Sequence, residues 1–221
     1  MEHQADPVVT IPVHRLQRIT DIIFAFSMVL FIISGMLTFN NADFWDGYEA
    51  DPAGFVTGQA RELLTSFLVF LFMAIYWTTH VGQSKYIIRV DTTYIWINIF
   101  YLFFISIAPL PNALSLKFGD DIYVQQFFNL DMLLIGIFSY FAWYYATKGH
   151  RLVIQHLSGR EIRETNWNML IEPLVALIAI LVSLTYPVLW ELALLLLPIG
   201  MIILTIVLRK SKKKAEKEKP G

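Results

Sequence analysis

The side chains whose chemistry is most informative in this sequence are carboxyl groups within or beside long apolar stretches. Asp131 lies inside one such stretch, and Glu172 stands with Pro173 near the start of another. A charged carboxylate at mid-helix costs about 2.5 to 3.5 kcal/mol in hydrocarbon on the milder insertion scales, so each must face protein or water. Either group could cap or pair a neighbour, or couple the movement of a proton or a substrate.

A second group of polar residues is expected to form one layer at the ends of three apolar stretches. Arg15 and Asp21 begin the first stretch. Trp77 and His80 end the second, and Asn98 lies early in the third. Arg15 could pair with Asp21, while His80 and the Trp77 indole supply hydrogen bonds between the segments. We interpret this layer as a scaffold and not as a catalytic site.

The first apolar stretch also carries small polar residues at every seventh position, beside aliphatic ones. These are Thr20, Ser27 and Ser34, with Ile23, Leu30 and Leu37 next to them. In an anchoring helix this stripe would be a tight packing seam, whereas in a symmetric oligomer it could line a pore. A bulkier face of Phe26, Leu30 and Ile33 overlaps it, and a ring of such groups would form a narrow hydrophobic constriction.

The composition excludes several classes of protein. Of 221 residues, 56% are hydrophobic and 16% are charged, and the mean hydropathy of +0.55 lies outside the usual range of water-soluble domains. Cysteine is absent, which excludes disulfides, thiol chemistry and cysteine-ligated metals. His80 alone among the histidines lies at or near an apolar stretch, too few for a haem held by paired histidines. We therefore expect that the protein is not an enzyme and that it binds no cofactor, metal or nucleic acid.

Six stretches could span a bilayer, whose hydrocarbon core of roughly 30 Å requires about 20 residues of helix. They cover residues 22–39, 63–79, 94–114, 127–146, 169–186 and 189–208. Pro109 and Pro111 should kink or end the third, and Pro187 marks a tight turn between the last two. The longest connection, 40–62, is predicted to be a polar loop. We predict an all-α integral membrane fold of six transmembrane helices, with an N-terminal segment 1–14, a membrane domain 15–208 and a basic tail 209–221.

Charge sets the orientation of these segments. With the N-terminus inside, 15 of the 17 Lys and Arg residues lie in cytosolic segments, which leaves Arg61 and Lys117 outside. This is the positive-inside pattern, so we predict that both termini are cytosolic in a multi-pass cell-membrane protein. The outer loops are acidic and could raise the local concentration of cations. The Lys-rich tail either retains the last helix or binds anionic lipid headgroups.

Three segments together resemble a known family. Residues 15–21, Arg-Leu-Gln-Arg-Ile-Thr-Asp, resemble the Arg-x-x-x-Phe-Ser-Asp motif that opens helix 1 in the transmembrane protein 175 family of potassium channels. Residues 66–69 with Tyr-Trp-Thr-Thr-His at 76–80 look like that family's second helix, and residues 96–111 look like its third. The likeness in helix number, loop lengths and motif order spans nearly the whole chain. Its single six-helix unit is similar to the short prokaryotic members.

The resemblance implies a homotetrameric cation channel, in the plasma membrane of a prokaryote, that conducts K⁺ as its permeant ion. Helix 1 of each subunit would line the pore without a re-entrant filter loop, and no Thr-Val-Gly-Tyr-Gly sequence occurs. The family's constriction carries over to Phe26, Leu30 and Ile33. Further pore-lining candidates are Ile23, Ser27, Ser34 and Leu37. The residues expected to hold the helices together are Arg15, Thr20, Asp21, Trp77, His80 and Asn98.

The sequence departs from the family pattern at three places. Ile19 replaces the motif Phe, and Thr20 replaces the motif Ser but keeps a hydroxyl. Phe26 stands where the family usually has Ile, and four phenyl rings around one axis could narrow or seal the pathway. The alternative functions are a secondary transporter that uses Asp131 or Glu172 as its coupling carboxylate, a haem-binding oxidoreductase, and a non-conducting structural member of the same family.

Overall fold

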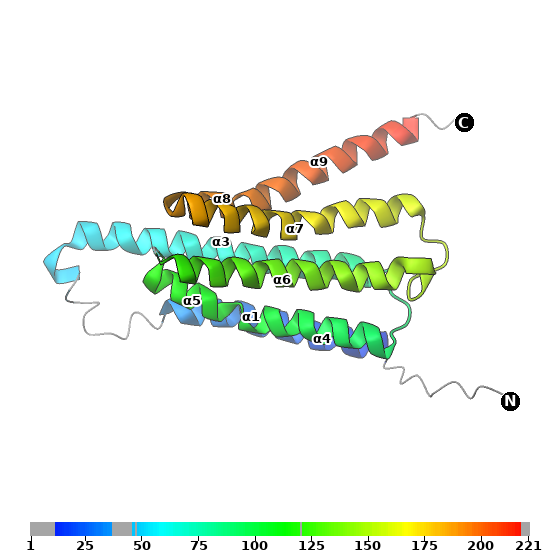
Figure 1. Cartoon of the computed structure of the whole chain (residues 1–221), viewed down its shortest axis with the longest axis horizontal. Helices are drawn as coiled ribbons and strands as arrows, with labels where there is room; N and C mark the ends of the chain where they lie inside the picture. The colour runs from blue at the N-terminus through cyan, green and yellow to red at the C-terminus, as the bar shows by residue number, and fades with distance from the viewer. Residues whose placement is uncertain (1–11, 37–45, 47, 120, 218–221) are drawn as a thin grey trace.

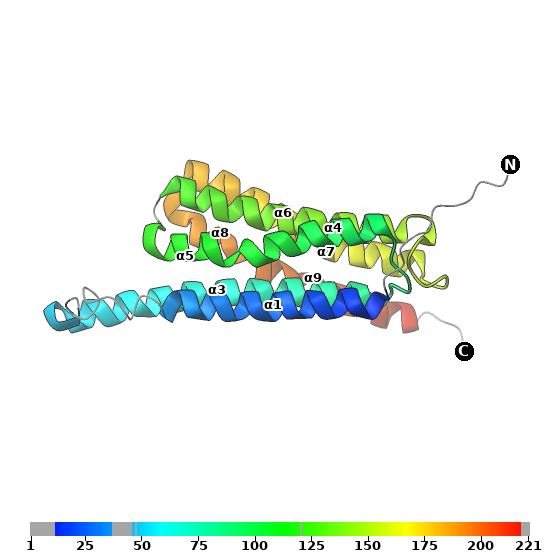
Figure 2. The ribbon, with the colours of Figure 1, turned by 90° about the horizontal axis from the view of Figure 1, so that it is seen from below.

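The helices of this protein lie roughly parallel to one another in two layers. The computed structural model describes residues 12–36, 46, 48–119 and 121–217. α1 and α3 run side by side in one layer, and α4, α6 and α7 form the other, as two perpendicular views show (Figures 1 and 2). The bounds are α1 (Val13–Met36), α3 (Pro52–Ser84), α4 (Thr92–Ile107), α6 (Ile122–Thr147) and α7 (Gly159–Thr185). Buried apolar side chains form two clusters, and the larger one contains residues of both layers.

The chain traverses the bundle back and forth, so that the start of α1 and the end of α9 (Leu196–Lys217) lie at the same end (Figure 1). Among the described residues, five helical segments are long and apolar enough to cross a membrane. α3 contains the predicted span 63–79 but is not one of the five. The all-helical membrane architecture is therefore confirmed, while the count of six spans and the cytosolic placement of both ends stay predictions.

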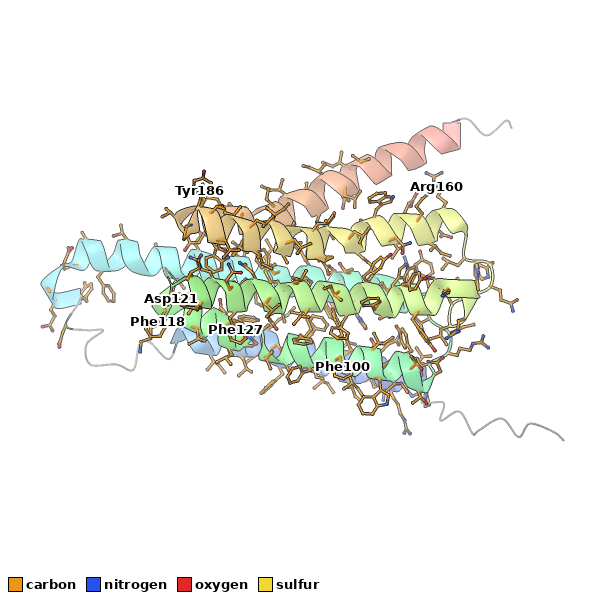
Figure 3. The ribbon with its side chains drawn as sticks, in the orientation of Figure 1. Phe100, Phe118, Asp121, Phe127, Arg160 and Tyr186 are labelled. Carbon is orange, nitrogen blue, oxygen red and sulfur yellow. The ribbon has the colours of Figure 1, made fainter. Side chains whose placement is uncertain are left out.

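Exposed aromatic side chains mark the two ends of the bundle. At one end they are Trp96, Tyr144 and Trp167, and at the other Phe118, Tyr123 and Tyr186. Figure 3 shows Phe118 and Tyr186 at the end opposite Arg160. Tyr123 and Tyr144 belong to the same helix and are separated by about 32 Å along its axis at 1.5 Å per residue. This spacing matches the hydrocarbon thickness of a bilayer, whose interfaces favour amphipathic aromatic rings.

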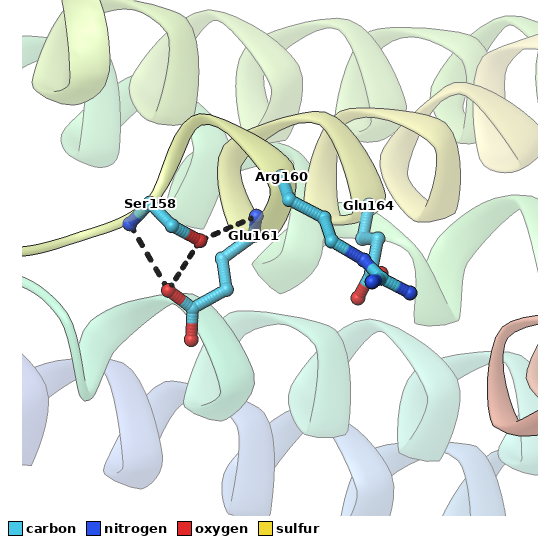
Figure 4. Close-up of polar contacts among 4 residues, drawn as sticks. All are labelled: Ser158, Arg160, Glu161 and Glu164. Carbon is cyan, nitrogen blue, oxygen red and sulfur yellow. Dashed lines mark hydrogen bonds and ion pairs between the residues drawn. The ribbon is translucent and has the colours of Figure 1, made fainter. Parts of the chain in front are cut away.

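Two helices begin earlier than their apolar stretches indicate. α3 begins at Pro52, where Asp51 caps it by accepting a hydrogen bond from the backbone N–H of Gly54 at 3.1 Å, so the predicted loop 40–62 is wrong in its second half. α7 begins at Gly159 and not near 169, behind a capping box formed by Ser158 and Glu161 (Figure 4). Glu172 and Pro173 consequently lie at the middle of α7 and not at its start.

The proline positions interrupt helices as predicted. α4 ends at Ile107 and α5 (Pro109–Phe118) begins two residues later, because proline lacks the N–H that would continue the helix. Pro187 opens a short 3₁₀ turn, η3 (Pro187–Leu189), which leads through α8 (Trp190–Leu194) into α9. Both predicted interruptions are thus confirmed.

Two loops are joined at the end of the bundle where the chain starts. The backbone N–H of Ile88 donates to the Leu152 carbonyl at 2.9 Å, and that of Ile154 donates to the Tyr86 carbonyl at 3.1 Å. The second loop follows η2 (Lys148–His150), in which Gly149 has φ +64°, a conformation that costs glycine little. We call this paired segment, residues 86–88 with 152–154, the loop clasp.

Candidate functional site

α1 presents two faces of opposite character. Its buried face consists of Thr20, Phe24, Ser27 and Phe31, which recur at intervals of four, three and four residues and pack against the neighbouring helices. Its other face is exposed and entirely apolar at Ile22, Phe26, Val29 and Ile33. A single subunit therefore covers one side of α1 and leaves the other side to lipid or to another subunit.

The three residues of the predicted constriction lie on or beside the exposed face. Phe26 is 63% exposed and Ile33 is 42% exposed, while Leu30 is partly exposed. The spacing of four and three residues places them along one stripe of the helix. The subunit itself therefore leaves these side chains available to a common axis, although it does not supply that axis.

Ser27, a predicted pore-lining candidate, lies on the buried face of α1 within the subunit. Its side chain is 0% exposed, and its hydroxyl oxygen has no hydrogen-bond partner among the described residues. Thr20 is equally buried and returns its hydroxyl to the carbonyl of Leu16 at 2.9 Å. Both small side chains serve the tight packing seam, which was one of the two interpretations of the seven-residue repeat.

The remaining pore-lining candidates have different positions. Ile23 is partly buried and packs against the apolar core. The side chain of Ser34 and the whole of Leu37 lie outside the described residues. Of the wider set, none that the structure describes lies fully on the exposed face of α1.

The polar layer joins α1 to α3 through one bond. The Trp77 indole N–H donates to Asp21 Oδ1 at 3.0 Å, across 56 residues of sequence. Arg15 is exposed and forms no ion pair with Asp21 in the part of the chain that is described, contrary to the prediction. Because six residues of helix turn the chain by about 240°, the two side chains leave α1 in different directions.

His80 and Asn98 are buried, but the contacts that the structure gives for them are not the interhelical hydrogen bonds that we expected. His80 stacks on Tyr101 of α4 with ring centroids 5.6 Å apart and also lies near Phe24 of α1. Through ring packing it therefore joins its own helix, α3, to α4 and α1. Asn98 donates to the Tyr94 carbonyl of its own helix at 2.8 Å, so this bond does not join α4 to another element.

A second set of polar side chains is enclosed within the subunit, away from the exposed face of α1. Glu172 is 0% exposed, and neither carboxyl oxygen has a hydrogen-bond partner among the residues that the structure describes. Tyr76 and Tyr101 are also buried, and their hydroxyl groups likewise have no hydrogen-bond partner among the described residues. α7 reaches this position because Gly136 of α6 has no side chain: an added Cβ would lie 2.8 Å from Pro173 Cδ. We call Glu172, Tyr76, Tyr101 and Thr79 the buried polar cluster.

A polar cavity of about 290 Å³ lies between α3, α7 and α9. Thr79 and Lys85 line it from α3, and Thr205 lines it from α9. The wall from α7 contains Glu161, Glu164, Thr165 and Asn168. We call this space the α3–α7 cavity, and its α7 wall begins at the helix start shown in Figure 4.

The sequence contained a signal for this cavity that our prediction missed. Glu161, Thr165, Asn168 and Glu172 follow one another at intervals of four, three and four residues, which places them on one face of α7. The pattern was hidden because the helix was expected to begin only at 169. Within the described part of the chain, no group of three or more His, Cys, Asp or Glu side chains is arranged to hold a metal ion.

Comparisons with known proteins agree with this architecture. A family model described as the endosomal/lysosomal potassium channel TMEM175 matches residues 15–109, which include α1, α3 and α4. Curated proteins gave no match. The crystal structure of a lysosomal potassium-selective channel TMEM175 homolog from Chamaesiphon minutus matches with a TM-score of 0.69 at 18% identity, covering 86% of this chain and 96% of that chain. An identity this low shows the fold alone. The chain is thus similar to the TMEM175 channels in sequence over its first long helices and in fold over most of its length.

Proposed function

We propose that this protein is a cation channel, favouring K⁺, which assembles as a homotetramer with α1 of each subunit lining a central pore. The observation that carries the proposal is the exposed apolar face of α1, which contains Phe26 and Ile33 and lies within the segment that the family model matches. The chain's own core does not cover this face. Four copies around one axis would cover it and would form the constriction from Phe26, Leu30 and Ile33.

Such a constriction would control conduction through its hydration. An apolar ring offers no oxygen ligand to replace the water around a cation, so a narrow ring empties of water and closes, while a wider one admits hydrated ions. Phe26 is the largest side chain of the three. Its rings set the minimum width, and their rotation would open or close the path.

The proposed setting is the plasma membrane of a prokaryote, with both termini cytosolic. The exposed aromatic side chains at both ends of the bundle support the membrane setting. The concentration of basic residues on the side of the termini supports the orientation. No chemical reaction and no cofactor enter this mechanism, because ions move down their own gradient.

The test is K⁺ flux from liposomes that contain purified protein whose tetrameric mass has been verified. The wild-type protein should dissipate a K⁺ gradient, and Phe26→Ile and Leu30→Ala should each raise the rate several-fold because both remove bulk from the constriction. Leu181→Ala is the matched control, since Leu181 is 63% exposed on α7 and lies outside the proposed pore. Absence of flux in all verified tetramers, or an equal effect of Leu181→Ala, would overturn the proposal.

A further inference from the structure

Glu172 carries a carboxyl group that is fully buried at the middle of a helix. It is the middle residue of α7, about 20 Å of helix from either end. Its side chain is fully buried, and both oxygens are without hydrogen-bond partners among the described residues. An isolated carboxylate in such a place is strongly unfavourable, so the group requires either a counter-charge or a hydrogen-bonding ligand.

Three hydroxyl-bearing side chains interact with this carboxyl. The Thr79 hydroxyl of α3 is adjacent to Glu172, and the Tyr76 and Tyr101 hydroxyls lie within its electrostatic range. All three hydroxyl oxygens are buried, and none has a hydrogen-bond partner in the described part of the chain. Their unsatisfied state matters because buried polar atoms in proteins are nearly always partnered by protein, water or an ion.

The α3–α7 cavity approaches this cluster at Thr79. Thr79 belongs both to the wall of the α3–α7 cavity and to the surroundings of Glu172. Along α7 the cavity wall continues from Glu161 through Thr165 and Asn168, one helical turn before Glu172. The cavity wall carries two carboxyl groups, Glu161 and Glu164, and one amine, Lys85; Glu164 is paired with Arg160 at 2.9 Å, so charges of both signs lie along it.

We propose that the buried polar cluster binds one monovalent cation, with Glu172 as the charged ligand, Thr79 as the second, and Tyr76 and Tyr101 completing an oxygen shell. Hard cations take oxygen ligands, and a single carboxylate balances a single positive charge. This site differs from the proposed pore in two respects. It lies inside one subunit, and it uses the covered side of the bundle and not the exposed face of α1.

The geometry also favours a monovalent over a divalent ion. A divalent cation is usually bound by several carboxylates, whereas no group of three acidic or histidine side chains converges within the described residues. Asp131, the other deeply buried acid, lines a small cavity together with Tyr76, whereas Glu172 does not line it. A bound K⁺ would join α3 to α7 by a shared ligand shell and would stabilise the subunit.

The first test measures thermal unfolding of the purified protein in detergent as K⁺ replaces N-methyl-D-glucamine at constant ionic strength. A ligand that binds only the folded state raises the unfolding temperature with its concentration. We expect a rise of several degrees in the wild-type protein, its loss in Glu172→Gln and its reduction in Thr79→Val. The rise should persist in Asp131→Asn, the matched buried-acid control, and in Leu30→Ala, which alters the proposed pore but not this site. An equal response in Glu172→Gln and wild type, or a loss specific to Asp131→Asn, would overturn the proposal.

The second test locates the ion and does not depend on how the variants fold. Tl⁺ replaces K⁺ chemically and scatters X-rays anomalously, so a crystal of the wild-type protein grown with Tl⁺ should show a peak within bonding distance of the Glu172 oxygens. Infrared spectroscopy of the same protein in K⁺ should show no neutral carboxylic acid band assignable to Glu172. A missing Tl⁺ peak, or an acid band that disappears in Glu172→Gln, would show a protonated structural residue instead and overturn the site. The flux assay is read separately, so failure of the site would leave the channel proposal standing.

Discussion

The exposed face of α1 and the buried polar cluster use opposite chemistry at similar depth in the bundle. The face around Phe26 is apolar and points away from the subunit, whereas the cluster around Glu172 consists of oxygen atoms that point into it. An apolar face is stable in lipid without a partner, but a buried carboxyl is not. The pore proposed for the first region requires assembly of subunits, whereas the cation site proposed for the second requires one subunit only.

This difference indicates which measurement reports on each region. Changes on the exposed face should alter ion flux and leave the stability of the subunit almost unchanged. Changes at the cluster should alter stability, and its dependence on K⁺, before they alter flux. Three substitutions test whether the two regions are independent in this way.

The largest effect is expected from Gly136→Val, which would introduce a side chain at the contact between α6 and the Glu172–Pro173 segment of α7. A Cβ at this position would lie 2.8 Å from Pro173 Cδ and 3.3 Å from Glu172 Cβ, so α6 and α7 must separate. Overpacking of this kind costs about 1 to 3 kcal/mol, and we expect a clear fall in unfolding temperature and in protein yield. The control is Gly58→Ala, where an added Cβ meets nothing within 4 Å. Equal stability of the two variants would mean that the close α6–α7 contact does not hold Glu172 in place.

A smaller effect is expected from Trp77→Phe, which removes the side-chain hydrogen bond between Trp77 of α3 and Asp21 of α1. The indole N–H that donates to Asp21 is lost while an aromatic ring remains. A hydrogen bond of this type contributes about 1 kcal/mol, so the unfolding temperature should fall slightly, and flux should fall because α1 is held less firmly. Trp96→Phe is the control, since Trp96 is exposed on α4 and contacts Phe100 through its ring. If both variants behave alike, the Trp77–Asp21 bond does not orient α1.

The smallest effect is expected from Ser27→Ala on the buried face of α1. Because the Ser27 hydroxyl has no partner among the described residues, its removal should change stability by less than about 1 kcal/mol and leave K⁺ flux unchanged. Ile33→Ala on the exposed face should raise flux in the same assay. Should Ser27→Ala change ion selectivity as strongly as Ile33→Ala changes rate, α1 would have to turn about its axis in the conducting tetramer.

Hydropathy predicted the apolar part of each helix but not where two of them begin. α3 and α7 start with polar turns at 52–62 and 159–168, which carry no hydropathy signal because they need not lie in hydrocarbon. Their caps were readable: Asp51 before Pro52, and Ser158 three residues before Glu161. Taking these caps into account would have extended α7 and revealed the polar stripe that leads to Glu172.

The faces of α1 could be predicted only in part. A repeat of seven residues identifies a stripe but does not say whether it faces a neighbouring helix or a shared axis, since small residues suit both. Thr20 and Ser27 proved to face neighbouring helices. The Arg15–Asp21 pair could have been rejected from helical geometry alone, whereas the Trp77–Asp21 bond depends on the packing of α1 against α3, which one sequence does not reveal.

The loop clasp has a mechanical consequence for this bundle. Its two backbone hydrogen bonds fasten the hairpin between α3 and α4 to the hairpin between α6 and α7, so these four helices are tied at one end. α9 departs from the bundle toward the same end (Figure 1), and a Cβ added at its Gly200 would lie 3.3 Å from Ile171 Cγ2. Among the described residues α9 takes no part in the loop clasp and packs against α3 and α7, so a change in its position would leave the two clasp hydrogen bonds intact.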